Sequence, residues 1–92
     1  MELKEFNKIL KDHTYTKDVH PKITNVILEE PHEIFLNSID LFSDIKEIAI
    51  IKTPQNGIEI QLYDEDENNQ LTINLEEIES LRIYTNSLDD LE

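Results

Sequence analysis

A chain of 92 residues has enough length for one hydrophobic core and not for two, so we expect residues 1–92 to form a single domain. Its 21 acidic residues outnumber its eight lysine and arginine residues, and the formal net charge of -13 argues against direct binding to nucleic acid or to an anionic membrane. The sequence has no cysteine, which excludes disulfides and cysteine-ligated metal sites and predicts a reducing cytoplasm as the compartment.

The first 30 residues predict a helix, a turn and a strand. Apolar residues at positions i, i+3 and i+7 of one helical face predict an amphipathic helix at 2–12. The dipeptide His20-Pro21 marks a turn, because the residue before a proline is disfavoured in a helix. Residues 23–29 are rich in β-branched side chains and predict a strand.

Residues 31–45 are compatible with two predictions. Pro31 at the first position of a helix is a favourable start signal, and an apolar stripe with helical spacing follows it, so we expect a second helix at 31–45. The alternative pairs residues 32–37 with the preceding strand through a turn at 29–32 and leaves only a short helix at 38–45. The stripe consists of Ile34, Leu41, Phe42 and Ile45, with Ser38 interrupting it.

From residue 47 onward the pattern is that of an antiparallel sheet. Apolar and polar residues alternate through 58–64, which predicts a strand with one buried face. Asn56-Gly57 before it supplies the positive φ of tight hairpin turns, and Asn74 with Glu77 matches a capping box. The predicted elements are strands at 48–53, 58–64, 70–75 and 81–85, turns at 54–57 and 65–69, a short helix at 75–80 and an acidic tail at 86–92.

Together these elements predict an α+β fold. It has an N-terminal helix, a second helix around 31–45, an antiparallel sheet of about four to five strands and a short helix before the last strand. No apolar run approaches the roughly 20 residues of a membrane span, so we expect no membrane association.

The excess of acidic over basic residues lies after residue 22. Residues 23–92 hold 17 acidic and three basic residues, whereas residues 1–22 are close to neutral. Alternate residues of a strand are about 6.6 Å apart, a spacing comparable in scale to that of the phosphates along a nucleic-acid strand. We therefore expect a row of acidic side chains to act as phosphate surrogates toward a basic partner. The candidate partner-binding residues are Glu29, Glu30, Glu59, Asp64, Glu65, Asp66, Glu67, Glu76, Glu77 and Glu79.

A calcium loop is the weaker alternative for the most acidic segment. Asp64, Asp66 and Asn68 match the first three ligand positions of such a loop. The match then fails, because Asn69 replaces the required glycine and Leu75 replaces the bidentate glutamate. We expect a solvated turn here, with no metal.

Other chemistry has little support in the sequence. The histidines at 13, 20 and 32 lack metal-ligand spacing, and we expect His13 and His20 to be surface groups. Paired carboxylates occur throughout the chain and indicate no particular acid–base site. We expect a protein that is not an enzyme and has no cofactor.

The chain resembles the small, acidic, cysteine-free α+β inhibitors of phages and mobile elements, of which the anti-CRISPR proteins that block a CRISPR nuclease are the nearest. The likeness is carried by Asn7-Lys8-Ile9-Leu10-Lys11-Asp12, running into Tyr15-Thr16, and then by Ile23-Thr24-Asn25-Val26-Ile27. It covers the first third of the chain, and the order after it departs because the strongest hairpin comes late, at 48–64. The resemblance implies a carboxylate surface that occupies a basic DNA-recognition groove.

We therefore expect a non-enzymatic inhibitor that acts as a DNA mimic on a nuclease, as a monomer or a small homo-oligomer. One alternative is an immunity or antitoxin-like protein that neutralises a basic toxin. The other is a structural domain that binds its partner through a sheet edge.

Overall fold

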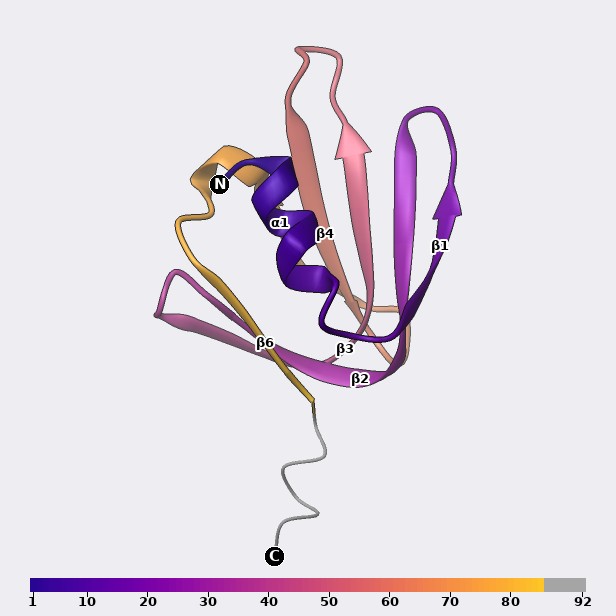
Figure 1. The fold of residues 1–92 in the computed structure, drawn as a ribbon, viewed down its shortest axis with the longest axis vertical. Helices are drawn as coiled ribbons and strands as arrows, with labels where there is room; N and C mark the ends of the chain where they lie inside the picture. The colour runs from indigo at the N-terminus through magenta and orange to yellow at the C-terminus, as the bar shows by residue number, and fades with distance from the viewer. Residues whose placement is uncertain (86–92) are drawn as a thin grey trace, which may run out of the picture.

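The computed structural model describes residues 1–85 as a single antiparallel sheet around one helix (Figure 1). The sheet has the strand order β1-β2-β3-β4-β5, and β6 pairs with β2 beside this path. None of the helices among the described residues is long and apolar enough to cross a membrane. The elements are α1 (Leu3–Leu10), β1 (Tyr15–Val19), β2 (Ile23–Leu36), β3 (Asp40–Lys52), β4 (Ile58–Asp64), β5 (Asn69–Asn74), the 3-10 helix η1 (Leu75–Glu77) and β6 (Leu81–Thr85).

The long strands β2 and β3 give the sheet its curvature. The first half of β2 pairs with β1 on one side, and its second half pairs with β6 on that side instead. The register with β3 shifts between Ile27 and His32 and again before Ile34. Such irregularities bend a strand and admit Pro31, which has no N–H group for a regular ladder. The sheet therefore wraps around α1, as Figure 1 shows.

The core lies between α1 and the concave face of this sheet. Phe6 and Leu10 of α1 are fully buried because their spacing places both on the helix face toward the strands. The central strands β2, β3 and β4 each contribute inward-facing residues to this core. The largest buried side chains there are Val26, Leu28, Ile34, Ile45, Ile48, Ile60 and Leu62, and Ile78 closes the core beyond η1.

The predicted α+β class with a second helix at 31–45 is wrong, because the sheet dominates the fold and this segment is a β-hairpin. His32, Ile34 and Leu36 are buried while the residues between them are half-exposed, which is the period of a strand. Asn37 and Ser38 then take positive φ values of 53° and 58° and turn the chain back into β3. The alternative with a short helix at 38–45 is wrong for the same reason.

Most of the other elements agree with the sequence prediction. The helix at α1, the strands β4 and β6 and the hairpin turn at 54–57 lie where they were predicted. The predicted helix at 75–80 is a 3-10 turn of three residues. Strand β1 was missed, so the sheet has six strands where about four to five were expected. The predicted acidic tail at 86–92 lies outside the described residues.

Candidate functional site

The turn between β4 and β5 presents four consecutive acidic residues, 64–67, which we call the acidic turn. The Asp64 Oδ1 atom accepts hydrogen bonds from the backbone N–H groups of Asp66 and Asn68, both at 2.9 Å. Its Oδ2 atom accepts a third from Gln70 Nε2 at 2.7 Å. These bonds, above all the one from Asn68, lower the pKa of Asp64. Asp64 thus shapes the turn, and Glu65, Asp66 and Glu67 project into solvent.

The strand register brings further carboxylates to the same end of the sheet. Asp64 pairs with Ile45 of β3, and one step inward Glu47 lies between Ile27 and Tyr63. Glu29 and Glu30 are exposed on β2, two strands away from the acidic turn, at a lateral distance of about 10 Å for two strand spacings. Lys46 also lies here and donates to the Glu29 carbonyl oxygen at 2.5 Å. We call this region the acidic end; it comprises Glu29, Glu30, Glu47 and residues 64–67.

The remaining predicted acidic residues form a separate group near η1. Glu59 pairs with Asn74 in the ladder between β4 and β5, at the opposite end of β4 from the acidic turn. It accepts a hydrogen bond from Gln61 Nε2 at 2.9 Å, and a Glu77 oxygen accepts from the Asn74 N–H at 3.4 Å. Glu76 and Glu79 are exposed. Because β4 spans about 20 Å, the predicted single row of carboxylates is divided into two groups.

The described residues do not assemble a metal centre. Both carboxylate oxygens of Asp64 are engaged by donors of its own turn. Asn68 is also a donor to Asp64, through its backbone N–H and its side chain. No group of three or more metal-ligating side chains occurs within residues 1–85. The acidic turn is therefore a hydrogen-bonded hairpin turn in this structure.

Two of the three histidines lie together, a contact that the sequence did not predict. The rings of His13 and His32 meet edge to face with their centroids 4.9 Å apart. His32 is buried, and its Nδ1 atom lies 2.7 Å from the Glu30 carbonyl oxygen. Burial, and secondarily the nearby His32, lower the pKa of His13. His13 is thus a half-buried group, whereas His20 is exposed and lies 3.3 Å from Asp18.

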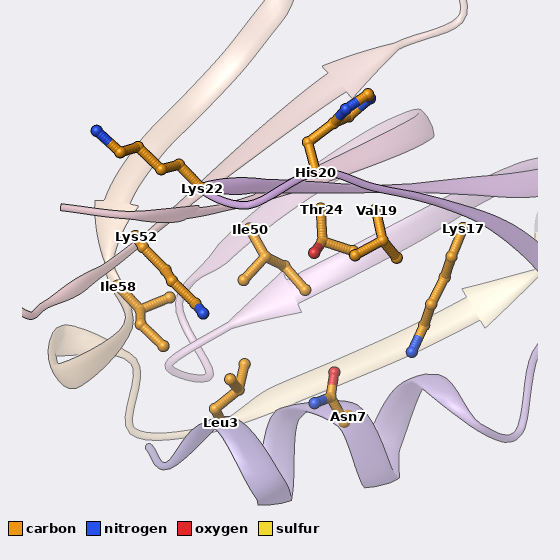
Figure 2. Close-up of a pocket in the computed structure, with 10 residues that line it drawn as sticks. All are labelled: Leu3, Asn7, Lys17, Val19, His20, Lys22, Thr24, Ile50, Lys52 and Ile58. Atoms are coloured by element: carbon orange, nitrogen blue, oxygen red, sulfur yellow. The ribbon is translucent and has the colours of Figure 1, made fainter.

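The structure also contains a groove between α1 and the sheet that the sequence did not predict. It lies at the ends of β1, β2 and β3, encloses about 200 Å³, and is lined in part by Lys17, Lys22 and Lys52 (Figure 2). Lys52 is far from Lys17 and Lys22 in the sequence, and the sequence did not predict strand β1. The signal that could have found the groove is a lysine at an inward position of a strand, which becomes visible only once the pairing is known.

No protein-family model matches the chain, and neither a curated protein nor a solved structure matches it. The function therefore has to be inferred from the surface chemistry of this sheet. The two features that depart most from an evenly mixed surface are the acidic end and the lysine-lined groove.

Proposed function

We propose that this chain is a non-enzymatic protein-binding domain whose acidic end occupies a basic groove that its partner uses for nucleic acid. The partner class is a nuclease or a similar enzyme, so the domain acts as an inhibitor of the DNA-mimic type. The proposal rests on one observation above all: seven carboxylates from adjacent strands gather at one end of the sheet, with Lys46 as the cation among them.

The spacing of these charges supports the proposal. Neighbouring strands are about 4.8 Å apart and alternate residues about 6.6 Å, the scale on which a nucleic-acid strand repeats its phosphates. The hydrogen bonds of Asp64 fix the turn that carries Glu65, Asp66 and Glu67, so little ordering is needed on binding. Attraction to a basic groove would accelerate the encounter and make it sensitive to salt. We place this encounter in the cytoplasm, the compartment that the cysteine-free sequence predicts.

The test is displacement of fluorescein-labelled duplex DNA from a panel of nucleases that includes CRISPR nucleases. We expect the protein to displace DNA from at least one of them at 50 mM NaCl and to bind more weakly at 500 mM. The variant Glu65→Gln/Asp66→Asn/Glu67→Gln should weaken this displacement by about tenfold or more, because each charge meets a basic groove.

A matched control removes the same number of charges elsewhere. The variant Glu2→Gln/Glu5→Gln/Asp18→Asn changes three exposed acidic residues outside the acidic end and should leave displacement within about twofold. Equal losses in the two variants would show that only net charge matters. Displacement of DNA from no nuclease, or displacement that does not respond to salt, would also contradict the proposal.

A second candidate function is favoured by an open edge of the sheet. Strand β3 pairs with β4 only from Ile45 onward, so residues 40–43 have no strand neighbour on that side among the described residues. The adjoining Ile39 and Leu41 are 79% and 56% exposed. Such an edge can accept a strand from a partner or from a second copy.

Sedimentation velocity distinguishes this second candidate. A sheet-edge dimer should persist from 50 mM to 1 M NaCl, because backbone pairing and apolar contact do not depend on charge attraction, and Leu41→Lys should abolish it. A monomer at high micromolar concentration in both salts would contradict self-association through this edge.

A further inference from the structure

The groove between α1 and the sheet combines an apolar lining with positive charge. Leu3 and Asn7 of α1 form one wall, and Val19, Thr24, Ile50 and Ile58 of the sheet form the other. Figure 2 shows Lys17 and Lys52 extending toward the helix from two sides of this hollow, with the Thr24 and Asn7 side chains between them. Lys22 and His20 stand at its rim. Polar donors thus surround a small hollow with an apolar lining.

The charge of the groove is opposite to that of the chain. Three of the eight basic residues of a protein with net charge -13 line this hollow, and no acidic residue does. None of the three lysines forms an ion pair within 4 Å with a carboxylate of the described residues. The sequence has 21 acidic residues, yet the Lys17 ammonium group lies over the Tyr15 ring, 5.7 Å from its centroid, as a cation–π contact. Lys17 and Lys52 both extend toward the hollow (Figure 2), and two ammonium groups beside one hollow without a carboxylate call for an anionic occupant.

The positions of Lys17 and Lys52 strengthen this inference. Lys17 pairs with Val26, and Lys52 with Ile58, so both side chains emerge on the concave face that buries Val26, Ile48 and Ile50. An inward charge on the edge strand β1 could serve to prevent edge-to-edge pairing. That role does not account for Lys52, because β3 lies between β2 and β4.

We infer that this groove binds a small organic phosphate whose phosphate group lies between Lys17 and Lys52 and whose apolar part lies against the lining. A phosphate monoester carries a charge of about -1.5 to -2 at pH 7, which several lysines can balance as point charges. Thr24 and Asn7 supply further hydrogen-bond donors. The volume of about 200 Å³ admits a phosphate with one small ring. The groove and the acidic turn lie at opposite ends of β4, so this inference stands independently of the proposed function.

The test is an NMR titration of the ¹⁵N-labelled full chain with phenyl phosphate at pH 7.5 and 50 mM NaCl. Saturable shifts should appear at the amides of Val19, Thr24 and Ile50, which lie beside the hollow. Inorganic phosphate should bind several-fold more weakly because it lacks the apolar part, and phenol should cause no saturable shift because it lacks the charge. Absence of saturation by phenyl phosphate, or equal affinity for inorganic phosphate, would overturn the inference.

Charge-matched variants separate the groove from the general effect of positive charge. Lys17→Gln/Lys52→Gln should raise the Kd for phenyl phosphate about tenfold. Lys8→Gln/Lys11→Gln removes one lysine of α1 and the lysine that follows the helix, neither of which lines this groove, and should leave the Kd within about twofold. If the first variant fails to fold, Lys17→Gln and Lys52→Gln are measured singly, and each should weaken binding about threefold. Equal effects of groove and helix variants would overturn the assignment.

Discussion

Asp64 differs from its neighbours in the acidic turn because both of its carboxylate oxygens are already hydrogen-bonded. Its lowered pKa means that its charge is stabilised by the turn, and this contribution to stability is lost as the pH falls through the folded-state pKa. A partner would therefore meet Glu65, Asp66 and Glu67, whereas replacement of Asp64 would alter the turn itself. For this reason the charge-removal variant leaves Asp64 in place.

His13 provides a prediction on pH dependence. Its pKa is lower in the folded chain than its ordinary value of 6.5, because burial and the nearby His32 disfavour the imidazolium. The unfolded chain therefore binds a proton more readily, and stability is lost as the pH falls below about 6.5 toward the folded-state pKa. In His13→Gln this loss is absent. We expect the difference in unfolding free energy between wild type and His13→Gln to shrink from pH 7.5 to 5.5 in urea titrations.

The control for this prediction is His20→Gln, which removes an exposed imidazole from a different turn. It corrects for the general effect of losing a histidine. A wild-type advantage over His13→Gln that stays constant or grows as the pH falls would contradict the assignment of the lowered pKa to this contact.

At the scale of elements, Asn37 ties the β2–β3 hairpin to the loop between η1 and β6. Its Oδ1 atom accepts hydrogen bonds from the backbone N–H groups of Glu79 at 2.7 Å and Ser80 at 3.2 Å. Its Nδ2 atom donates to the Glu77 carbonyl oxygen at 3.2 Å. Its φ of 53° lies in a region that asparagine tolerates better than most residues. One side chain thus fixes the path by which the chain enters β6.

Replacement of Asn37 should consequently destabilise the whole domain. Asn37→Ala loses three hydrogen bonds of about 1 kcal/mol each and places a Cβ-bearing residue with no local hydrogen bond at positive φ. We expect the free energy of unfolding to fall by about 2–4 kcal/mol. Asn37→Gly keeps the loss of hydrogen bonds but relieves the backbone, so it should be about 1 kcal/mol less destabilising. Urea denaturation of both variants is the measurement, and a loss below about 0.5 kcal/mol in Asn37→Ala would show that the loop does not depend on this side chain.

Elements with local signals were predictable, and elements defined by pairing were not. The α1 stripe and the Asn56-Gly57 turn were sufficient to predict a helix and a hairpin. The sequence of segment 31–45 has apolar residues at helical spacing, whereas in the structure buried and half-exposed residues alternate there with the period of a strand. Only the curvature of the sheet decides between the two periods, because it buries His32 on the concave face. Strand β1 has weak local signals, since four of its five residues are exposed.

The candidate sites likewise contain some residues that the sequence predicts and others that only strand pairing brings together. Consecutive carboxylates at 64–67 are visible in the sequence, and a turn between two strands has to expose them. Glu47 joins them only through its cross-strand position beside Tyr63. Lys17 and Lys52 line the same groove only because β1 and β3 flank β2. The site residues that the sequence did not predict are therefore those whose neighbours depend on pairing between strands that are distant in the sequence.

At the scale of the whole molecule, few charged side chains of the described residues lie beside a side chain of opposite charge. Between described side chains the structure shows one contact within 4 Å between a basic and an acidic group, that of the exposed His20 with Asp18, which is an ion pair only when His20 is protonated. Carboxylates gather at the acidic end, and lysines gather around the groove at the other end of β4. The net charge of -13 therefore acts mainly as self-repulsion within the folded chain, which destabilises compact states.

This balance predicts that salt stabilises the protein. Screening shortens the Debye length from about 10 Å at 0.1 M to about 3 Å at 1 M, so it weakens repulsion among the acidic residues while few ion pairs are lost. We expect Tm to rise by about 4–8 °C between 0.05 and 1 M NaCl, which corresponds to about 1 kcal/mol for a domain of this size. Circular dichroism melts provide the measurement.

The charge-removal variant Glu65→Gln/Asp66→Asn/Glu67→Gln separates screening from a general effect of salt on hydration. It should melt at a higher temperature than wild type at 0.05 M NaCl and gain less from added salt, because part of the repulsion is already gone. A general strengthening of apolar burial by salt would instead give both proteins the same slope. A Tm that falls with NaCl would mean that attraction between charges stabilises the fold, and the acidic end would then be held by partners within this chain and be less free to meet a basic groove.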